Sequence, residues 1–430
     1  MSKIWDKTNT KLNSLVEDYT VGNDHIVDLE FMIFDIQGSL AHAKGLKSIG
    51  ILTAEELTQI EGALGKLAEL ASAKKVEIPK EMEDSHTFIE SFLTEQIGET
   101  GKKIHTGRSR NDQALTMIRL WQLDKLAQLE SSLKSLITLL LEKAKAYADV
   151  PFPGYSHTQQ AMLTSVGHYL AAYAESLLDD LQSLESTKAI LNKNPLGSAA
   201  GFGSNLELNR MLTTAELGFD APIVNSLYAQ NTRGKLDSIY AESMAQIMLT
   251  LNKIANDFLF FTTRELNYFD VPAELTTGSS IMPQKRNLDL LEILKGKSSR
   301  VISKQLELKN IYKDGISGYN REIQFTKEIL LEITDITQSS LQVIALFFEQ
   351  IKPNAKNIED SIKKDIFSAD IATQMSQDQG IPFRDAYKLA MKKAGQGEFD
   401  LQEELKKKKS LGSAGNLGLE LLEERLSGFI

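Results

Sequence analysis

The chain has 430 residues, of which 42% are hydrophobic and 25% are charged. This is ordinary globular composition, and the length predicts two or three domains, because single cores stop growing near ~250–300 residues. The net charge of -10 argues against a nucleic-acid partner, and an acidic substrate would need a local cluster of Arg and Lys. The absence of cysteine excludes disulfides, thiolate nucleophiles and cysteine-based metal sites.

No segment predicts export or membrane insertion. Residues 1–15 lack the apolar core of a signal peptide. The apolar run at 258–261 is far shorter than the ~20 residues that a membrane span needs. Together with the lack of cysteine, these features predict a cytoplasmic protein with no membrane partner.

Proline placement predicts where the long helices lie. The first 105 residues indicate shorter helices, with breaks at Gly22, Gly50 and Pro79. Prolines interrupt helix interiors, so proline-free stretches leave room for long helices. The remainder after Pro353 is more polar, which places domain boundaries near residues 105 and 353. The proline-free stretches are residues 80–150, 154–194, 223–271 and 284–352.

Apolar residues inside these stretches recur every three or four positions, as on one face of a helix. The longest such apolar seam runs from Leu236 to Phe261. Shorter seams run over Leu126–Leu140, Met162–Leu177 and Leu330–Phe348. At 247–249 and 258–261 a helix would be apolar on more than one face, so it must be buried on all sides. This predicts a helical bundle that continues across subunits, and a single thick monomeric core is the alternative.

Four segments break the helical pattern and carry groups suited to chemistry. The first, residues 102–113, is mostly polar and precedes a long predicted helix. Arginine offers a planar fork of donors for a carboxylate, and helix N-termini favour anions. The same composition also suits a capped, solvated helix start, so both interpretations stay open.

The other three segments are equally open when taken singly. Residues 153–160, at a predicted helix start, contain His157, which suits acid–base chemistry but is more often structural in such a place. Residues 275–287 predict a flexible loop whose serine could act as a base if Lys285 stabilised its alkoxide, or a plain surface loop. Residues 318–327 predict a polar approach to a ligand, or a polar helix face.

Two further patterns predict no site. Gly197, Gly201 and Gly203 have the wrong spacing for a dinucleotide-binding loop, and no strand–helix–strand unit surrounds them. The group of Asp84, His86 and Glu90 is too loosely spaced to predict a metal site, and a charged helix start explains it better.

Taken together and in this order, the four segments resemble the argininosuccinate lyase branch of the fumarase/aspartase superfamily. The superfamily loop GSSxMPxKxN corresponds to residues 278–287, and its MPQK form, with Gln284, is typical of that branch. HTGRSRNDQ from His105 is more specific still. PGYSHTQ, NPLGSAAG, GYNREIQFTKE and DIQGSLAHA stand in matching positions, and the resemblance runs from about residue 21 to residue 388.

The resemblance implies an all-α fold in three domains, at residues 1–105, 106–353 and 354–430, whose long central helical bundle forms a homotetramer. Each active site would draw residues from different subunits. The implied reaction is a β-elimination that splits argininosuccinate into arginine and fumarate, a step of arginine biosynthesis, with neither a metal nor an organic cofactor. The main physical demand is to stabilise an enediolate in a cation-lined, water-poor site.

The matching motifs also imply residue roles. Ser279 would be the base, and His157, polarised by Glu292, would assist proton transfer. The reverse assignment, with His157 as the base, is the alternative. Lys285 and Asn287 would stabilise the carbanion. The remaining candidates would hold the substrate, and they are Thr20, His86, Ser109, Arg110, Asn111, Ser156, Tyr319, Gln324 and Lys327.

The sequence departs from the family pattern at a few positions. Ser156 stands where Thr is common, Thr20 where Ser is usual, and Leu288 replaces the Pro that usually follows Asn287. Two other interpretations remain. Another fumarate-releasing lyase of the superfamily is opposed by Gln284 and by GRSRNDQ, and an inactive crystallin-like structural homologue is opposed by the intact set of proposed catalytic residues.

Overall fold

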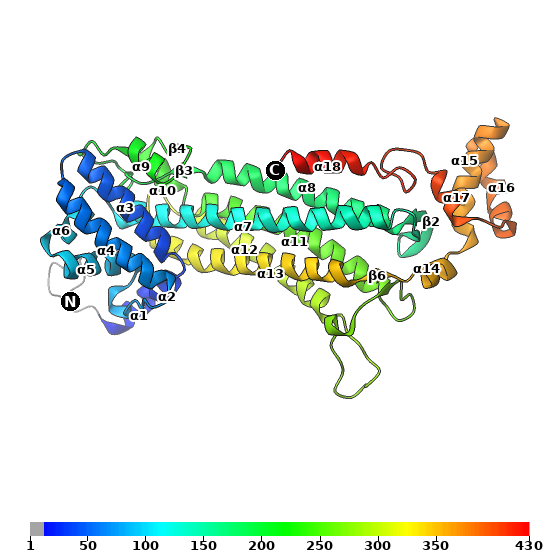
Figure 1. Cartoon of the computed structure of the whole chain (residues 1–430), viewed down its shortest axis with the longest axis horizontal. Coiled ribbons are helices and arrows are strands. Elements are labelled where there is room, and N and C mark those ends of the chain that lie inside the picture. The colour runs from blue at the N-terminus through cyan, green and yellow to red at the C-terminus, as the bar shows by residue number, and fades with distance from the viewer. Residues whose placement is uncertain (1–12, 430) are drawn as a thin grey trace. The chain divides into compact units, whose positions relative to one another are not determined.

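The computed structural model describes residues 13–429, and α-helices dominate its secondary structure (Figure 1). Each of the long helices lies within one of the proline-free stretches, so the prediction of long helices there is confirmed. These helices are α7 (Arg110–Ala146), α8 (Val166–Leu191), α11 (Lys235–Phe261), α12 (Asp289–Lys313) and α13 (Thr326–Gln350).

The predicted apolar seams form buried faces of these helices. On α7 the seam leucines are fully buried, namely Leu126, Leu129, Leu133, Leu136 and Leu140. The α11 seam from Leu236 to Phe261 is at most 5% exposed. Burying each large apolar side chain stabilises the fold by about 1.5–3 kcal/mol. Leu249 of α11, however, is 45% exposed. The prediction that this helix is buried on all sides is therefore not met within a single chain.

The segment around His157 is a β-hairpin, and the prediction of a helix start there is wrong. Strands β1 (Pro151–Ser156) and β2 (Gln159–Ser165) pair antiparallel, and α8 begins only at Val166. Two prolines within β1 lack N–H donors and have fixed φ, which suits an edge strand better than a helix interior. Met162, counted in a helical seam, instead lies in β2 and is 39% exposed.

The chain divides into two compact units, each built from separated stretches of sequence. Unit 1 contains the described residues up to Gln128, together with Leu184–Ser243 and Ile302–Asp335. Unit 2 contains Leu129–Ser183, Met244–Val301 and the residues from Ile336 onward. The unit boundaries fall within all of the long helices. The three domains at 1–105, 106–353 and 354–430 stay a prediction.

Unit 1 contains the N-terminal helices, whose core is formed by α3, α4 and α5 around buried residues such as Leu46, Leu64 and Ile89. Helix α4 starts with a capping box between Thr53 and Glu56, which satisfies backbone donors that a helix start leaves free. The shorter helices are α1 (Ser14–Val21), α2 (Asp24–Val27), α3 (Met32–Ser48), α4 (Ala54–Ser72), α5 (Ser85–Ile97), α6 (Glu99–Lys102), α9 (Arg210–Glu216) and α10 (Ser226–Asn231), with 3-10 turns η1 (Lys80–Met82), η2 (Lys103–His105) and η4 (Arg321–Phe325) and the parallel strands β3 (Lys193–Asn194) and β4 (Ala221–Pro222).

Unit 2 has an aromatic core in which Phe258 of α11 contacts Phe269, Phe347 and Phe348. Phe152 anchors the hairpin to the same region by packing edge-on against Phe261. The remaining elements are α14 (Ala355–Ser361), α15 (Ser368–Gln379), α16 (Phe383–Gln396), α17 (Leu401–Lys406) and α18 (Leu419–Ser427), the 3-10 turns η3 (Ala273–Leu275) and η5 (Lys364–Phe367), and the antiparallel strands β5 (Phe269–Asp270) and β6 (Lys352–Pro353).

One helical stretch of the described chain, Arg321–Gln350, is long and apolar enough to cross a membrane by length and composition alone. Within its most apolar window 44% of the residues are buried in the fold, including Ile333 and Ile344. The core helix of a soluble protein passes the same test, so this stretch is a weak indication of a membrane span.

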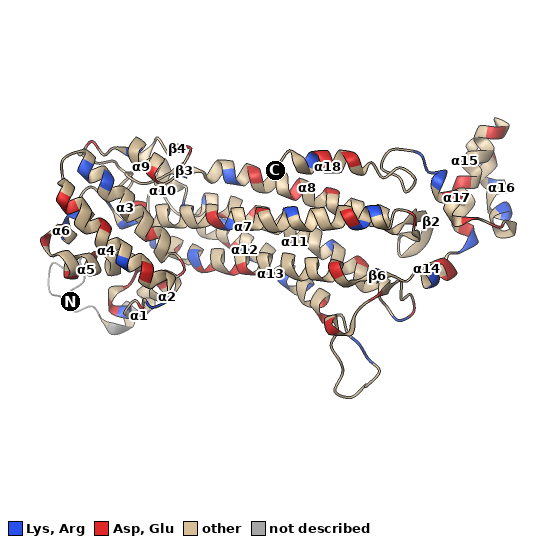
Figure 2. Ribbon diagram, in the orientation of Figure 1, with Lys and Arg blue, Asp and Glu red and all other residues tan. Residues whose placement is uncertain are grey.

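Figure 2 shows acidic and basic residues interspersed along the long helices.

Candidate active site

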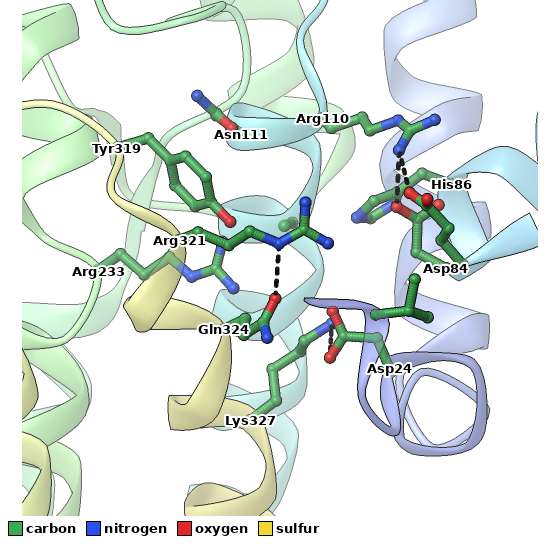
Figure 3. Close-up of a pocket in the computed structure, with 13 residues that line it drawn as sticks. Asp24, Asp84, His86, Arg110, Asn111, Arg233, Tyr319, Arg321, Gln324 and Lys327 are labelled. Carbon is green, nitrogen blue, oxygen red and sulfur yellow. Dashed lines mark hydrogen bonds and ion pairs between the residues drawn. The ribbon is translucent and has the colours of Figure 1, made fainter. Parts of the chain in front are cut away.

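A cavity of about 170 Å³ in unit 1 gathers most of the predicted substrate-binding residues of that unit (Figure 3). It lies beside the starts of α5 and α7 and against η4 and α13. The predicted residues that line it are His86, Arg110, Asn111, Tyr319, Gln324 and Lys327. Three segments that are separate in the sequence thus lie together at one cavity of a single chain.

Local hydrogen bonds explain why the α7 segment presents its side chains here. The Ser109 hydroxyl accepts the N–H of Asn111, and the Asp112 carboxylate accepts the N–H of Ser109. These two bonds cap the N-terminus of α7. Ser109 is therefore a helix cap that does not line the cavity, and its role in binding substrate stays a prediction. Arg110 and Asn111 follow it and face the cavity.

Asp112 also fixes the glycine-rich segment that resembled a dinucleotide loop. Its second carboxylate oxygen accepts the N–H groups of Gly197 and Ala199, at 3.0 and 2.9 Å. Burial raises the pKa of Asp112 to about 6, although these N–H donors and Arg108 oppose the shift. Because the carboxylate already accepts these N–H groups, they are not free to bind a phosphate.

The cavity carries both cations and carboxylates. Arg110 pairs with Asp84 at 3.2 Å and with Glu83 at 3.6 Å. The Arg321 Nε donates to the Gln324 side chain. Arg321 and Gln324 also donate to the backbone carbonyl of Thr20. Thr20 is thus fixed beside the cavity without lining it, and its contribution to binding stays a prediction.

Lys327 is the most deeply buried cation of the cavity. Its ammonium lies 2.6 Å from Asp28 and 3.2 Å from Asp24, and its side chain is 4% exposed. Burial alone would lower the pKa of Lys327, but Asp28 and Asp24 outweigh burial and raise it. An ammonium has three N–H donors. The two carboxylates leave one donor for a third partner in the cavity.

In unit 2 the predicted catalytic histidine lies at the tip of the β1–β2 hairpin. His157 and Thr158 form its two-residue turn with φ of 53° and 60°, a left-handed conformation that matches the twist of hairpins but is costly for a β-branched residue. Close to the turn, Tyr155 is held by its hydroxyl, which lies 2.8 Å from that of Tyr268. Ser156 and His157 are exposed in the single chain.

The predicted base lies in a loop closed by a pair of backbone hydrogen bonds between Thr277 and Asn287. Within this loop the Ser279 hydroxyl accepts the N–H groups of Ile281 and Met282, at 3.3 and 3.1 Å. Lys285 and Glu292 are exposed. Among the described residues of unit 2 no hydrogen bond or ion pair joins Glu292 to His157. The pairing of these two residues therefore stays a prediction.

Comparison with known proteins decides the family. The sequence pattern of the lyase family matches residues 7–303. The argininosuccinate lyase of Thermotoga neapolitana is 38% identical over 91% of this chain and 98% of its own length. That of Bacteroides fragilis is 37% identical over 99% of this chain and 96% of its own. This chain belongs to the argininosuccinate lyase family. It is accordingly a lyase, as the sequence resemblance predicts.

Solved structures confirm the superfamily fold of this family member. An EDDS lyase variant with bound fumarate superposes with a TM-score of 0.77 at 21% identity, over 98% of this chain and 90% of that one. The class II fumarase of Schistosoma mansoni gives a TM-score of 0.73 at 17% identity, over 87% and 91%. At these identities the structures establish the all-α fold alone.

In the described part of the chain no cluster of three or more His, Asp or Glu side chains has metal-binding geometry. Asp84 caps α5 by accepting the N–H of Thr87, His86 contacts Asp35, and Glu90 lies 3.4 Å from His105. Asp84, His86 and Glu90, the three residues considered as metal ligands in the sequence, thus each contact another group of the protein.

Sequence reasoning missed some residues of the cavity. Arg233 lines it, is 5% exposed and stacks over the ring of Tyr319 at 5.6 Å. It stands outside the recognised motifs, so no sequence signal pointed to it. Arg321 lies inside the GYNREIQFTKE motif but was given no role. Asp24 and Asp28 could not be assigned from spacing, because only the fold brings them to Lys327.

Proposed function

We propose that this chain cleaves argininosuccinate into arginine and fumarate by β-elimination, as a step of arginine biosynthesis. Relatives named argininosuccinate lyase, 36–39% identical over nearly the whole chain, support this proposal. The observation that carries it is the cavity of unit 1, where the family's substrate-binding positions meet. Of the motif residues matched to that role in unit 1, only Thr20 and Ser109 do not line it.

The charge pattern of the cavity suits this substrate. Argininosuccinate carries several carboxylates, an α-amino group and a guanidinium group. Lys327, Arg110 and Arg321 provide donors for carboxylates, while Asp24 and Asp84 provide acceptors for the cationic groups. Such mixed lining favours a zwitterionic substrate over a simple anion, which agrees with the family's substrate.

In the proposed elimination Ser279 first loses its own proton to solvent, and the N–H groups of Ile281 and Met282 stabilise the alkoxide. The alkoxide then takes the proton from the carbon next to a substrate carboxylate and becomes a hydroxyl again. The electron pair forms an enediolate, which Lys285 and Asn287 stabilise. The enediolate then collapses and the carbon–nitrogen bond breaks. The guanidinium nitrogen leaves with a proton that His157 helps to deliver, and Glu292 polarises the His157 ring. Ser156 would hold the substrate beside His157. No metal or organic cofactor takes part in these steps.

We further propose that active sites are shared within a homotetramer in the cytoplasm. Proton transfer and enediolate stabilisation need a water-poor site, yet His157, Lys285 and Glu292 are exposed in one chain. A second chain that covers them would supply that environment. The exposed Leu249 of α11 and Ile293 of α12 support an interface along the long helices.

Light scattering on the purified protein should therefore give a mass close to four times the 47.8 kDa of the chain. The matched test is Leu249→Glu, which places a charge on the exposed apolar face and should shift the population towards smaller species. Activity should fall together with the tetramer. A stable, fully active monomer at micromolar concentration would contradict both the tetramer and the shared sites.

The proposed activity is tested by mixing the purified protein with argininosuccinate and following fumarate absorbance. We expect fumarate to appear at the same rate with and without EDTA. Adenylosuccinate provides the control substrate for another fumarate-releasing lyase. Release of fumarate from adenylosuccinate alone would favour the sister lyase, and no release from either substrate would favour the inactive crystallin-like interpretation.

A further inference from the structure

Two buried carboxylates stand behind the cations of the unit 1 cavity, and one serine connects them. Asp28 and Asp35 are 0% and 1% exposed. The N–H of Ser85 donates to Asp28 at 3.1 Å, and its hydroxyl donates to Asp35 at 2.6 Å. Asp28 then contacts Lys327, and Asp35 contacts His86, each at 2.6 Å. Each buried carboxylate therefore orients one cavity-lining side chain.

The contact between Asp35 and His86 fixes which ring nitrogen faces the cavity. The Asp35 oxygen that accepts from Ser85 also lies 2.6 Å from the Nδ1 of His86, and its other oxygen accepts the Gln113 amide at 2.9 Å. These partners prevent the carboxylate from rotating. With Nδ1 engaged, the Nε2 of His86 is the nitrogen that remains for the cavity, towards which the ring points in Figure 3.

The charge of the ring decides what Nε2 can do. Beside an ionised Asp35, Nδ1 carries a proton in both charge states, so Nε2 is an acceptor in the neutral ring and a donor in the imidazolium. Burial alone would lower the pKa of His86, but Asp35, Asp84 and Asp28 outweigh burial and raise it. Burial likewise opposes ionisation of Asp35, yet His86 holds its pKa below the ordinary value.

Carboxylates and cations both surround His86. Asp24, Glu83, Arg233 and Arg321 line the same cavity, as do Arg110 of α7 and Lys327 of α13. The groups nearest the ring are Asp35 from α3, Asp28 from the segment after α2, Asp84 at the start of α5 and His105 of η2. The carboxylates closest to the ring thus favour its cationic form, and a cationic ring presents an N–H donor to the cavity.

We propose that Asp35 is a positioning residue that keeps His86 as an imidazolium whose Nε2–H binds a carboxylate of the substrate. This inference rests on the proposed function, since it assigns a partner to one cation of that site. It gives a role to Asp35, the first residue of the DIQGSLAHA motif, to which the sequence alone assigned no function. It also separates His86, which would touch substrate, from Asp35, which would act only through His86.

The pH dependence follows from the sign of the shift. A histidine with a raised pKa in the folded protein stays charged up to that pKa, so this part of substrate binding is present at low pH and is lost as the pH rises through it. The raised pKa of His86 stabilises the fold fully below the unfolded pKa near ~6.5, and this contribution is lost as the pH rises through the folded pKa. The lowered pKa of Asp35 stabilises the fold above the unfolded pKa near ~3.9, and this contribution is lost as the pH falls through the folded pKa.

Asp35→Asn removes the charge while keeping a side chain of nearly the same shape. We expect KM for argininosuccinate to rise about 10- to 100-fold, as for loss of a charged hydrogen bond, while kcat changes much less. The rise of KM with pH should also begin at lower pH in Asp35→Asn than in the wild type, because the ring loses the carboxylate that holds its proton.

The double variant Asp35→Asn/His86→Gln distinguishes positioning from a general structural role. If Asp35 acts through His86, the double variant should bind substrate no worse than His86→Gln alone. Additive losses, or an Asp35→Asn variant with unchanged KM and pH profile, would overturn the proposal. His86→Gln keeps the test open if Asp35→Asn does not fold, because unchanged KM in that variant would equally overturn it.

Calorimetric titration with fumarate and, separately, with arginine measures binding directly, so this test does not depend on turnover. We expect Asp35→Asn to weaken binding of one fragment about 10-fold or more and to leave the other nearly unchanged, which identifies the fragment whose carboxylate meets His86. Equal binding of both fragments to wild type and variant would reject the role of Asp35. Wild type that binds neither fragment would instead reject the proposed function.

Discussion

Ser279→Ala should lower turnover of argininosuccinate by roughly 10²- to 10⁴-fold. The Ser279 hydroxyl already accepts the N–H groups of Ile281 and Met282. The same donors would stabilise an alkoxide after its proton is removed, and alanine supplies no oxygen to accept a proton. Substrate binding should stay nearly intact, because the carboxylate donors Arg110 and Lys327 line a cavity in unit 1.

Ser280→Ala is the matched control, since it removes a hydroxyl from the same loop one position away. We expect it to be much milder, as the Ser280 side chain is exposed and the superfamily loop assigns the role to its first serine. Single-turnover assays of both variants, with binding measured separately, decide the assignment. Near wild-type turnover in Ser279→Ala, together with loss of turnover in His157→Ala, would move the base to His157.

The sequence could predict the long helices because their signal is local. Proline-free stretches and the seams at Leu126–Leu140 and Leu236–Phe261 depend only on residues within each helix. The order of the motifs along the chain also pointed to residues that line the cavity. His86, Arg110 and Lys327 lie far apart in the sequence, and the resemblance grouped them before any geometry was known.

Features that depend on tertiary contacts escaped prediction. The β1–β2 hairpin has no Asn-Gly or Asp-Gly turn signal, and His157 and Thr158 adopt positive φ in an anchored hairpin. The roles of Asp28 and Asp35 depend on Ser85, which lies about 50 residues further along the chain. No spacing rule connects such partners, so only the fold reveals that two cations of the cavity are each held by a buried carboxylate.

Lys327→Met should be damaging in two separable ways. It removes a donor for a substrate carboxylate, and it leaves Asp28 as a buried charge without its cation. Breaking a buried ion pair on one side costs about 3–5 kcal/mol of unfolding free energy, so chemical denaturation should give a markedly lower midpoint. Lys44→Met is the matched control, because Lys44 also lies 2.6 Å from its partner, Glu216, but on the surface. Its loss should cost less than about 1 kcal/mol.

The double variant Lys327→Met/Asp28→Asn separates stability from binding. Asparagine removes the uncompensated charge and can still accept the N–H of Ser85, so much of the lost unfolding free energy should return. Substrate affinity should not return, because neither of the two substituted side chains supplies a cation to the cavity. Denaturation curves and calorimetric titration with fumarate and with arginine on the same samples measure the two effects. Recovery of affinity along with stability would mean that Lys327 supports the fold and does not bind substrate.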